Sequence, residues 1–220
     1  QQGHQYTAGI IFKDRSWLLD IDAYYRTIDG ITSLTFGFLN PADPVLHQGS
    51  GFTKGVDVLL QKSTPTWKAW ATYTYQDAQN KFDQINNGNY FDTNAGIRHH
   101  LSVSCYKKWD AFALARGWFW RTGRPYSTLN ASNQISVLNS EQLPVYHRLD
   151  LSAIYQFKQS QKWSGKIGVS FYNVYDRRTV ISREYERIYT NLADVVTTKF
   201  RVQDYQSLGF MPNLFLRIAF

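Results

Sequence analysis

The feature that most constrains this chain is an alternation of apolar and polar residues that continues to its last residue, Phe220. Leu214, Leu216 and Ile218 share one face with Phe220 in an extended strand, whereas Arg217 falls on the other, because successive strand side chains point to opposite faces. Soluble strands average about five or six residues, whereas about ten tilted residues cross a bilayer. The alternation recurs in nine segments of about ten residues, near 4–13, 16–28, 51–62, 67–78, 97–107, 111–121, 145–157, 163–173 and 212–220. We therefore predict an all-β chain of antiparallel strands from a transmembrane β-barrel.

The composition fits a membrane protein built from strands. Aromatic residues make up 16% of the chain, yet the mean hydropathy of −0.41 is typical of water-soluble proteins. A barrel in lipid reconciles the two values, because only every second strand residue meets lipid. No run of about 18 apolar residues is present, so the sequence contains no transmembrane helix. The net charge of +7 comes partly from lysines beside short turns, where a barrel meets phospholipid headgroups, so we predict a lipid partner and no nucleic acid.

The two faces of the strands divide by charge. We expect one uncharged face to touch hydrocarbon, where a single Arg or Lys costs about 2–4 kcal/mol at mid-membrane. The candidate lumen-wall residues on the opposite face are Asp20, Asp22, Arg26, Asp57, Arg148 and Asp150. A soluble sandwich would also alternate, but a tryptophan lies at every short turn, as an aromatic girdle at one membrane interface requires. These residues are Trp17, Trp67, Trp109 and Trp163.

The connections between the segments alternate in length. Outer-membrane barrels have short periplasmic turns and long extracellular loops, so a periplasmic C-terminus would place every short connection on the periplasmic side. Nine strands cannot close a barrel with an even strand number, so we predict that residues 1–220 form part of a larger barrel and contain no plug domain. The short connections lie near 14–15, 63–66, 108–110 and 158–162, and the long ones at 29–50, 79–96, 122–143 and 174–210.

Segment 111–121 fits neither face cleanly. If Arg116 faces the lumen, its alternate neighbours Phe112, Leu114, Trp118 and Trp120 do as well. A β-bulge or an aromatic patch packed inward would explain this pattern, and the sequence leaves both open.

No catalytic or metal site emerges from the residue spacing. His99 and His100 are adjacent, so a strand points them to opposite faces and they cannot share a metal. Asp20 and Asp22 project to one face about 7 Å apart, a separation that acid/base pairs can use. Together with the neighbouring charges they favour a hydrated network on the inner wall. No Ser-His-Asp set has a recognisable spacing, so we predict no enzyme, no metal and no cofactor.

Aromatic residues in and near the long loops are the candidates for substrate contact, because rigid scaffolds display recognition loops. Their rings could stack on a sugar or an aromatic chelate, and an aromatic girdle at the outer interface explains them equally well. These candidate loop or rim aromatics are Tyr90, Phe91, Trp118, Trp120 and Tyr126.

From about residue 51 to the end, the order of motifs resembles the C-terminal barrel half of TonB-dependent outer-membrane receptors. Asn173 and Asp176 match that family's Asn-x-x-Asp. Each motif is weak alone, but their shared order is fairly specific. The matching stretches are GVDVLLQK at 55–62, WATYTYQDAQN at 70–80, RHHLSVSCYKKW at 98–109, WRTGRPYS at 120–127, YHRLDLSAIYQF at 146–157, GVSFYNVYDRRTV at 168–180 and the terminal GFMPNLFLRIAF.

The resemblance implies a 22-stranded barrel, of which this chain would be roughly strands 14 to 22, in the outer membrane of a Gram-negative bacterium. It implies import of a scarce nutrient, gated by a plug domain and energised through that plug by TonB. The nutrient class stays open among ferric siderophores, haem, cobalamin, glycans and peptides. The strand that carries Leu214, Leu216, Ile218 and Phe220 would be the signal that the barrel assembly machinery reads.

Two other functions remain open at this point. The chain could be a receptor-like barrel that serves as a structural or interaction subunit of a larger outer-membrane complex, with the charged segment 174–210 as the docking surface. A barrel enzyme that uses Asp20 and Asp22 is the third possibility.

Overall fold

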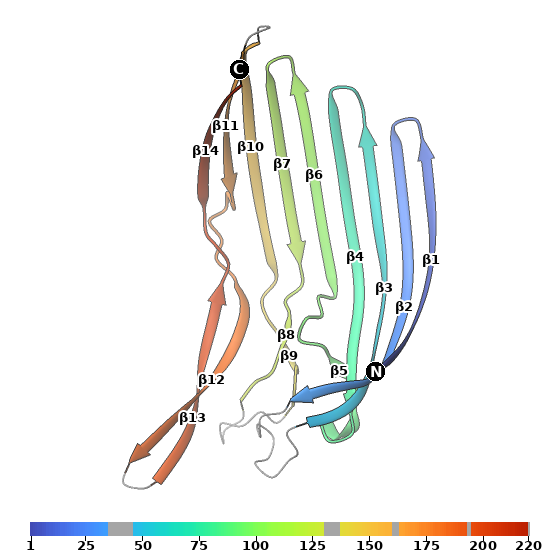
Figure 1. Cartoon of the computed structure of the whole chain (residues 1–220), viewed down its shortest axis with the longest axis vertical. Helices are drawn as coiled ribbons and strands as arrows, with labels where there is room; N and C mark the ends of the chain where they lie inside the picture. The colour runs from blue at the N-terminus through green and yellow to red at the C-terminus, as the bar shows by residue number, and fades with distance from the viewer. Residues whose placement is uncertain (35–45, 130–136, 160–162, 193–194, 220) are drawn as a thin grey trace.

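The computed structural model is one large antiparallel sheet with shorter elements at one end (Figure 1). It describes residues 1–34, 46–129, 137–159, 163–192 and 195–219. Nine long strands cross the sheet, and each corresponds to a segment expected from the alternation. They are β1 (Gln2–Asp14), β2 (Trp17–Leu34), β3 (Leu46–Ser63), β4 (Trp67–Phe82), β6 (His99–Trp109), β7 (Phe112–Arg121), β10 (Tyr146–Gln159), β11 (Ser164–Tyr172) and β14 (Met211–Ala219).

The long strands pair with their neighbours in chain order, so the sheet is a meander. In Figure 1 the tight turns of the β1–β2, β3–β4 and β6–β7 hairpins lie at the same end as the C-terminus, and the long connections lie at the other end. Arg15 and Asp110 have φ values of 34° and 39° in two of these turns, the left-handed conformation that tight two-residue hairpins use. The expected alternation of short and long connections is confirmed for these strands.

The long connections contain ordered elements where the sequence suggested plain loops. β12 (Val180–Leu192) and β13 (Val195–Gln206) form a separate hairpin within 174–210. The pattern missed it because neither face of this segment is consistently apolar. Shorter elements are β8 (Pro125–Tyr126), β9 (Glu141–Gln142), β5 (Phe91–Asp92), which pairs with β4, and the 3₁₀ turn η1 (Asn86–Gly88).

The register assigns the strand side chains to two faces, because directly paired residues share a face. One row across β2, β3, β4, β6, β7 and β10 is apolar over most of its length and consists of Ile21, Val58, Tyr73, Leu101, Trp120 and His147. The neighbouring row points the other way and consists of Asp22, Asp57, Thr74, His100, Arg121 and Tyr146. We call these two sides of the sheet the apolar face and the polar face.

The register also shows to which face each side chain of segment 111–121 points. Arg116 pairs with Cys105 on one side and with Leu151 on the other, and β7 has no register shift with either neighbour. Both explanations offered by the sequence, a bulge and an inward aromatic patch, are therefore wrong. The expectation of a charge-free apolar face fails at Arg116, which shares that face with Phe112, Leu114, Trp118 and Trp120. Lys54 and Asp77 also lie on this face, nearer the loop end of β3 and β4.

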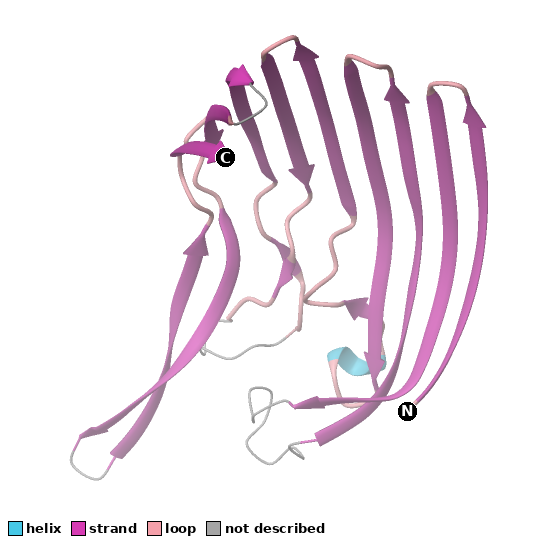
Figure 2. Cartoon of the chain, turned by 45° about the horizontal axis from the view of Figure 1, so that its top comes forward, coloured by secondary structure: helices cyan, strands magenta, loops and turns pink. Residues whose placement is uncertain are grey.

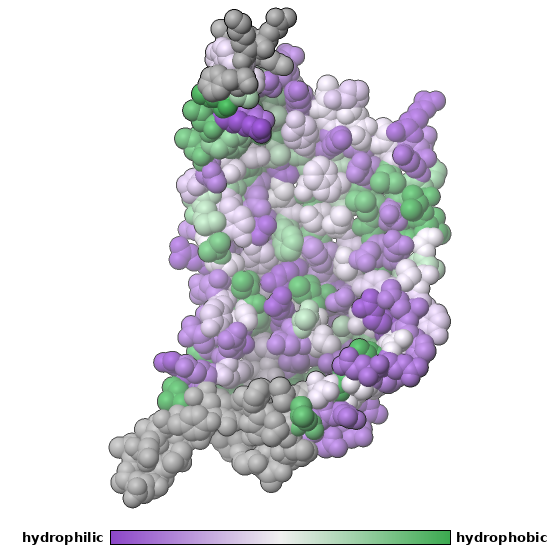
Figure 3. All heavy atoms as spheres, in the orientation of Figure 1, coloured by the Kyte–Doolittle hydropathy of each residue, from purple (hydrophilic) through white to green (hydrophobic). Residues whose placement is uncertain are grey.

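No second sheet or helix covers either face of this sheet within the described residues. Figure 2 shows the sheet curling between its margins β1 and β14 without closing. Apolar side chains stay exposed, with Ile10 73% and Leu214 71% accessible, and hydrophobic residues gather over both margins in Figure 3. A soluble sandwich would bury these side chains against a second sheet, so the described residues exclude that alternative.

Candidate functional site

Three candidate carboxylates lie together on the polar face of β2 and β3. Asp22 on β2 lies directly opposite Asp57 in the register with β3. The Thr74 hydroxyl donates a hydrogen bond of 2.6 Å to Asp57 Oδ1. Asp20 Oδ1 is buried without a hydrogen-bond partner among the described residues. Asp22 occupies the space beside Gly9, where an added Cβ would lie 2.0 Å from Asp22 Oδ1. This acidic group can attract cations or hydrogen-bond donors.

Arg26 does not pair with these carboxylates. Its Nε and Nη2 donate to Gln5 Oε1 on β1 at 3.1 and 2.8 Å. Because a neutral amide fixes the guanidinium, its charge stays available on the polar face.

Arg148 and Asp150 form a second polar group on β10. Arg148 Nε donates to Asp150 Oδ2 at 2.9 Å, and Nη1 donates to the hydroxyls of Tyr172 at 2.8 Å and Tyr146 at 3.2 Å. The guanidinium also lies 5.5 Å from the Phe119 ring centroid, a cation–π distance. β4, β6 and β7 separate this group from the carboxylates of β2 and β3, so the six candidate wall residues form two groups rather than one network.

The second group continues into the turn after β11. Asp150 Oδ1 accepts a hydrogen bond of 2.9 Å from the Asn173 backbone N–H. Asn173 is fully buried, and its Nδ2 donates to Arg177 O and to Leu208 O, each at 2.9 Å. Asp176 Oδ1 accepts from the Phe210 N–H at 2.7 Å. The Asn-x-x-Asp motif therefore ties the end of β11 to the segment that leads into β14.

A pocket of about 560 Å³ lies at the loop end of the sheet, between the segment after β4 and residues 137–140. The two segments are clamped together, because Asn86 donates to Leu138 O at 3.0 Å and accepts from Leu138 N–H at 2.8 Å. Sequence reasoning found Tyr90 and Phe91 and missed the amides, whose signal was the Asn-rich loop composition. The lining residues are Gln79, Gln84, Asn86, Asn87, Asn89, Tyr90, Phe91, Asp92, Val137, Leu138, Asn139 and Ser140.

The remaining loop candidate, Tyr126, lies outside this pocket. It sits in β8 with the Arg183 guanidinium 4.9 Å from its ring centroid. Tyr126 therefore belongs to the contact between β8 and the β12–β13 hairpin, which the Tyr185 hydroxyl extends by donating to Ser127 O.

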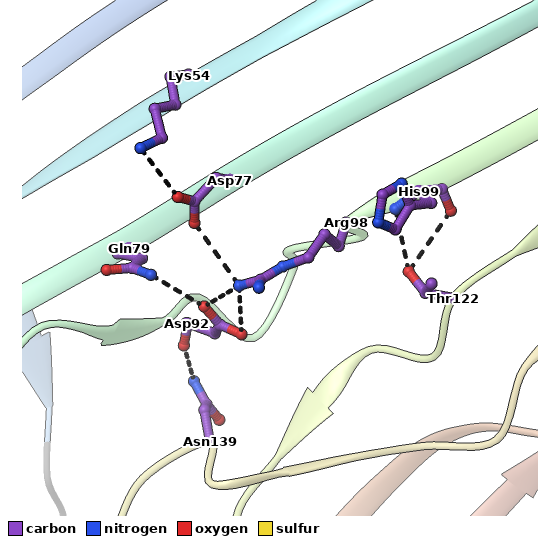
Figure 4. A network of polar contacts seen from close by, with 8 residues as sticks. All are labelled: Lys54, Asp77, Gln79, Asp92, Arg98, His99, Thr122 and Asn139. Carbon is purple, nitrogen blue, oxygen red and sulfur yellow. Dashed lines mark hydrogen bonds and ion pairs between the residues drawn. The ribbon is translucent and has the colours of Figure 1, made fainter.

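An ion-pair chain holds the loop ends beside the pocket (Figure 4). Asp77 lies 3.4 Å from Lys54 Nζ and 3.7 Å from an Arg98 nitrogen. Arg98 Nη2 also donates to Asp92 at 3.0 Å, and Asn139 Nδ2 donates to Asp92 O at 2.7 Å. The chain joins β3 and β4 to the loops after β4 and β7, and so fixes one side of the pocket.

Aromatic residues form two belts on the apolar face, and Trp118 and Trp120 belong to this face rather than to the pocket. Eight strand residues separate the belts, a distance of about 27 Å along the strand and about 20 Å across a membrane at a tilt of about 40°. The apolar band of outer-membrane barrels is about 25 Å tall. The paired belt residues are Trp17 and Tyr25, Trp67 and Tyr75, and Phe112 and Trp120.

Lysines accompany the tryptophans at the turn end. Lys62 Nζ lies 4.5 Å from the Trp17 ring centroid, and Lys107 Nζ lies 4.7 Å from that of Trp109. Such pairs suit a membrane interface, where the ring meets the apolar band and the ammonium reaches headgroups. Arg116 instead lies four residues from each belt, and a lipid-facing Arg at mid-membrane costs about 2–4 kcal/mol.

The final strand places its candidate assembly residues on the apolar face. Leu214 pairs with Val169, Leu216 with Ile167 and Ile218 with Gly165. Phe220 lies outside the described residues.

The described part of the chain contains no group of three His, Cys, Asp or Glu side chains that could hold a metal ion. It also contains no helix with the length and apolarity needed to span a membrane.

Comparison with solved structures gives the same architecture. The ferripyoverdine receptor of the Pseudomonas aeruginosa outer membrane matches 99% of this chain at 18% identity with a TM-score of 0.60. The ferric citrate transporter FecA matches 98% at 12% identity and 0.63, and the ferric-catecholate import receptor Fiu of E. coli matches 98% at 15% identity and 0.58. The chain spans 27% of the first, 31% of the second and 27% of the third of those proteins.

A search of curated proteins finds no significant match. The family model described as "TonB dependent receptor-like, beta-barrel" matches residues 1–174, which include eight of the nine long strands. Given that match and the sheet described above, the chain belongs to the TonB-dependent receptor-like β-barrel family.

Proposed function

We propose that this chain forms part of the wall of an active transporter in the outer membrane of a Gram-negative bacterium. The transporter imports a scarce nutrient, a plug domain gates the passage, and TonB supplies energy through that plug. No covalent chemistry is involved, and the chain is not an enzyme. The observation that carries the proposal is the two-faced sheet, with an apolar face between aromatic belts and a polar face with fixed charges.

The polar face supplies the wall of the passage in this proposal. The carboxylates of β2 and β3 and the guanidinium of Arg148 present opposite charges from different parts of the wall. A solute with both hydrogen-bond donors and acceptors would find complementary groups along this wall. The pocket beside Tyr90 offers amides and rings, a combination that suits initial capture of a polar solute with apolar parts.

The apolar and polar faces also define how the sheet is placed in the membrane. Lipid covers the apolar face, and the barrel assembly machinery recognises the strand that carries Leu214, Leu216 and Ile218. The tight turns and their Trp–Lys pairs face the periplasm, and the pocket faces the outside.

The test is uptake by cells that carry the full-length gene, its deletion, or the gene in a strain without TonB. A panel of radiolabelled iron chelates, haem, cobalamin, oligosaccharides and peptides is supplied at nanomolar concentration. We expect uptake of one class to require both the gene and TonB, while binding to cells persists without TonB. TonB-independent uptake, or recovery of the protein in the soluble fraction, would contradict the proposal.

A second candidate function is a structural or interaction subunit of a larger outer-membrane complex. It is favoured by the β12–β13 hairpin, which stands apart from the large sheet (Figure 1). Partners that co-purify stoichiometrically in mild detergent, and are lost when residues 183–203 are replaced by a short turn, would support it. Purification as a monomer would count against it.

A further inference from the structure

We propose that the apolar face around Arg116 binds a second membrane-embedded protein, which presents a carboxylate near the middle of the bilayer. The inference rests on the membrane placement in the proposed function and adds an interaction surface to it. Its starting point is a cation on the face that otherwise meets lipid.

The facing of Arg116 follows from two independent observations. The register pairs it with Cys105 and Leu151 on the apolar face. Solvent exposure along β7 alternates in the same phase, because Phe112, Leu114 and Arg116 are exposed while Ala113 and Ala115 are half-buried.

The depth of Arg116 disfavours a lipid headgroup as its ordinary partner. Arg116 lies four residues from Phe112 and four from Trp120, about 13 Å along the strand from either aromatic belt. Phosphates lie at the level of the belts or beyond, so the guanidinium approaches one only when its side chain snorkels over its full length.

The chain itself supplies no counter-charge. No hydrogen bond or ion pair joins Arg116 to another described residue. Between the belts, the described residues of the apolar face include no Asp or Glu, because Asp77 lies beyond Tyr75 on β4. A second copy that docked through this same surface would bring another Arg116, which repels the first, so we take a different chain as the occupant.

The surroundings of Arg116 suit a protein contact. The residues beside it on neighbouring strands are Cys105 and Leu151, and Leu114 and Trp118 flank it on its own strand. An Arg and Trp centre with an apolar surround is the composition of interface hot spots, and intramembrane charges generally pair with one another. The occupant is therefore a transmembrane strand or helix with one Asp or Glu among apolar residues.

The test uses the full-length protein in native outer membranes, with a photo-crosslinking amino acid in place of Cys105. This position lies directly across from Arg116 on the same face. We expect one discrete protein adduct whose crosslinked peptide is a membrane segment that contains an Asp or Glu. Arg116→Leu should reduce the adduct at least tenfold, whereas Arg116→Lys should retain most of it. Arg116→Glu combined with a Lys at the partner's carboxylate position should restore it.

The matched control is Arg217→Leu, which removes a cation from the polar face and should leave the adduct unchanged. Heat-modifiable mobility in gels checks that each variant is folded. Adducts with lipid only, or an adduct that Arg116→Leu leaves unchanged, overturn the inference. In either case TonB-dependent uptake measured in the same cells can persist, so failure here is distinguishable from failure of the proposed function.

Discussion

At the scale of single residues, the most constrained side chain is Asn173. Its backbone adopts φ of 51°, a left-handed conformation that Asn tolerates better than most residues. Its buried amide donates to two carbonyl oxygens from segments that lie 4 and 35 residues further along the chain. The residue thus determines both the turn after β11 and the approach to β14, and its role is architectural.

The first prediction concerns this residue. Asn173→Ala removes the side-chain donor to Leu208 O and leaves Arg177 O with only the longer 3.5 Å hydrogen bond from the Ser207 hydroxyl, so we expect a loss of about 2–4 kcal/mol in the free energy of unfolding. Urea unfolding of the full-length protein in lipid vesicles measures the loss. Val174→Ala, at the exposed neighbouring position, is the control and should cost less than about 1 kcal/mol. Equal losses in the two variants would show that the amide contacts do not stabilise the turn.

At the scale of elements, the β12–β13 hairpin is held by its own cross-strand charges and by a contact to β8. Arg183 Nε and Nη2 donate to the two Asp204 oxygens at 2.6 and 2.7 Å, and Arg201 pairs with Glu186. The bonds from Arg183 lower the pKa of the Asp204 carboxyl. A carboxyl with a lowered pKa in the folded state stabilises that state above its unfolded pKa of about 3.9 and loses the effect as pH falls through the folded value.

The second prediction follows from the lowered pKa of Asp204, which makes the hairpin less stable at acidic pH. Hydrogen exchange of residues 180–206, corrected for its intrinsic pH dependence, should show full protection at pH 7 and reduced protection as the pH falls below the unfolded carboxyl pKa of about 3.9. The pair lies near the surface, so the change should correspond to about 0.2–1 kcal/mol. Asp204→Asn should remove this pH dependence, and Glu184→Gln on the opposite face of the hairpin is the control. Protection that increases on acidification would contradict the assignment.

At the scale of the whole molecule, the sheet has an inside and an outside but no packed core of its own. Hydrophobic burial normally supplies the dominant favourable term in folding, and here the apolar face stays open within the described residues. Lipid would cover the apolar face. Further strands of a closed barrel would supply hydrogen bonds to the backbone groups at the two margins, because unpaired strand edges are not tolerated in hydrocarbon.

The third prediction tests this orientation with neighbouring positions on β3. Val58→Arg puts a cation on the apolar face four residues from the turn-end belt, and should cost about 2–4 kcal/mol of unfolding free energy in vesicles. Leu59→Arg puts the same cation on the polar face opposite Asp20, and should cost less than half as much. If the costs were equal, or reversed, the assignment of the lipid-facing side would be wrong.

The sequence by itself determined the nine long strands and most of their facing, because a period of two is a local property that each segment carries alone. It also identified the tryptophans at the turns and the Asn-x-x-Asp motif. Tertiary structure decided which way β7 faces, because Phe112 and Leu114 on one side and Ala113 and Phe119 on the other are all apolar, and only hydrogen-bonded register against β6 and β10 selects the side.

Tertiary structure also decided how the candidate site is divided. Asp57 and Asp150 look alike along the chain, yet three strands lie between their groups. The pocket near Tyr90 depends on Asn86 and Leu138, which are 52 residues apart. Contacts between loops distant in sequence depend on side-chain hydrogen bonds across space, and no local pattern encodes them.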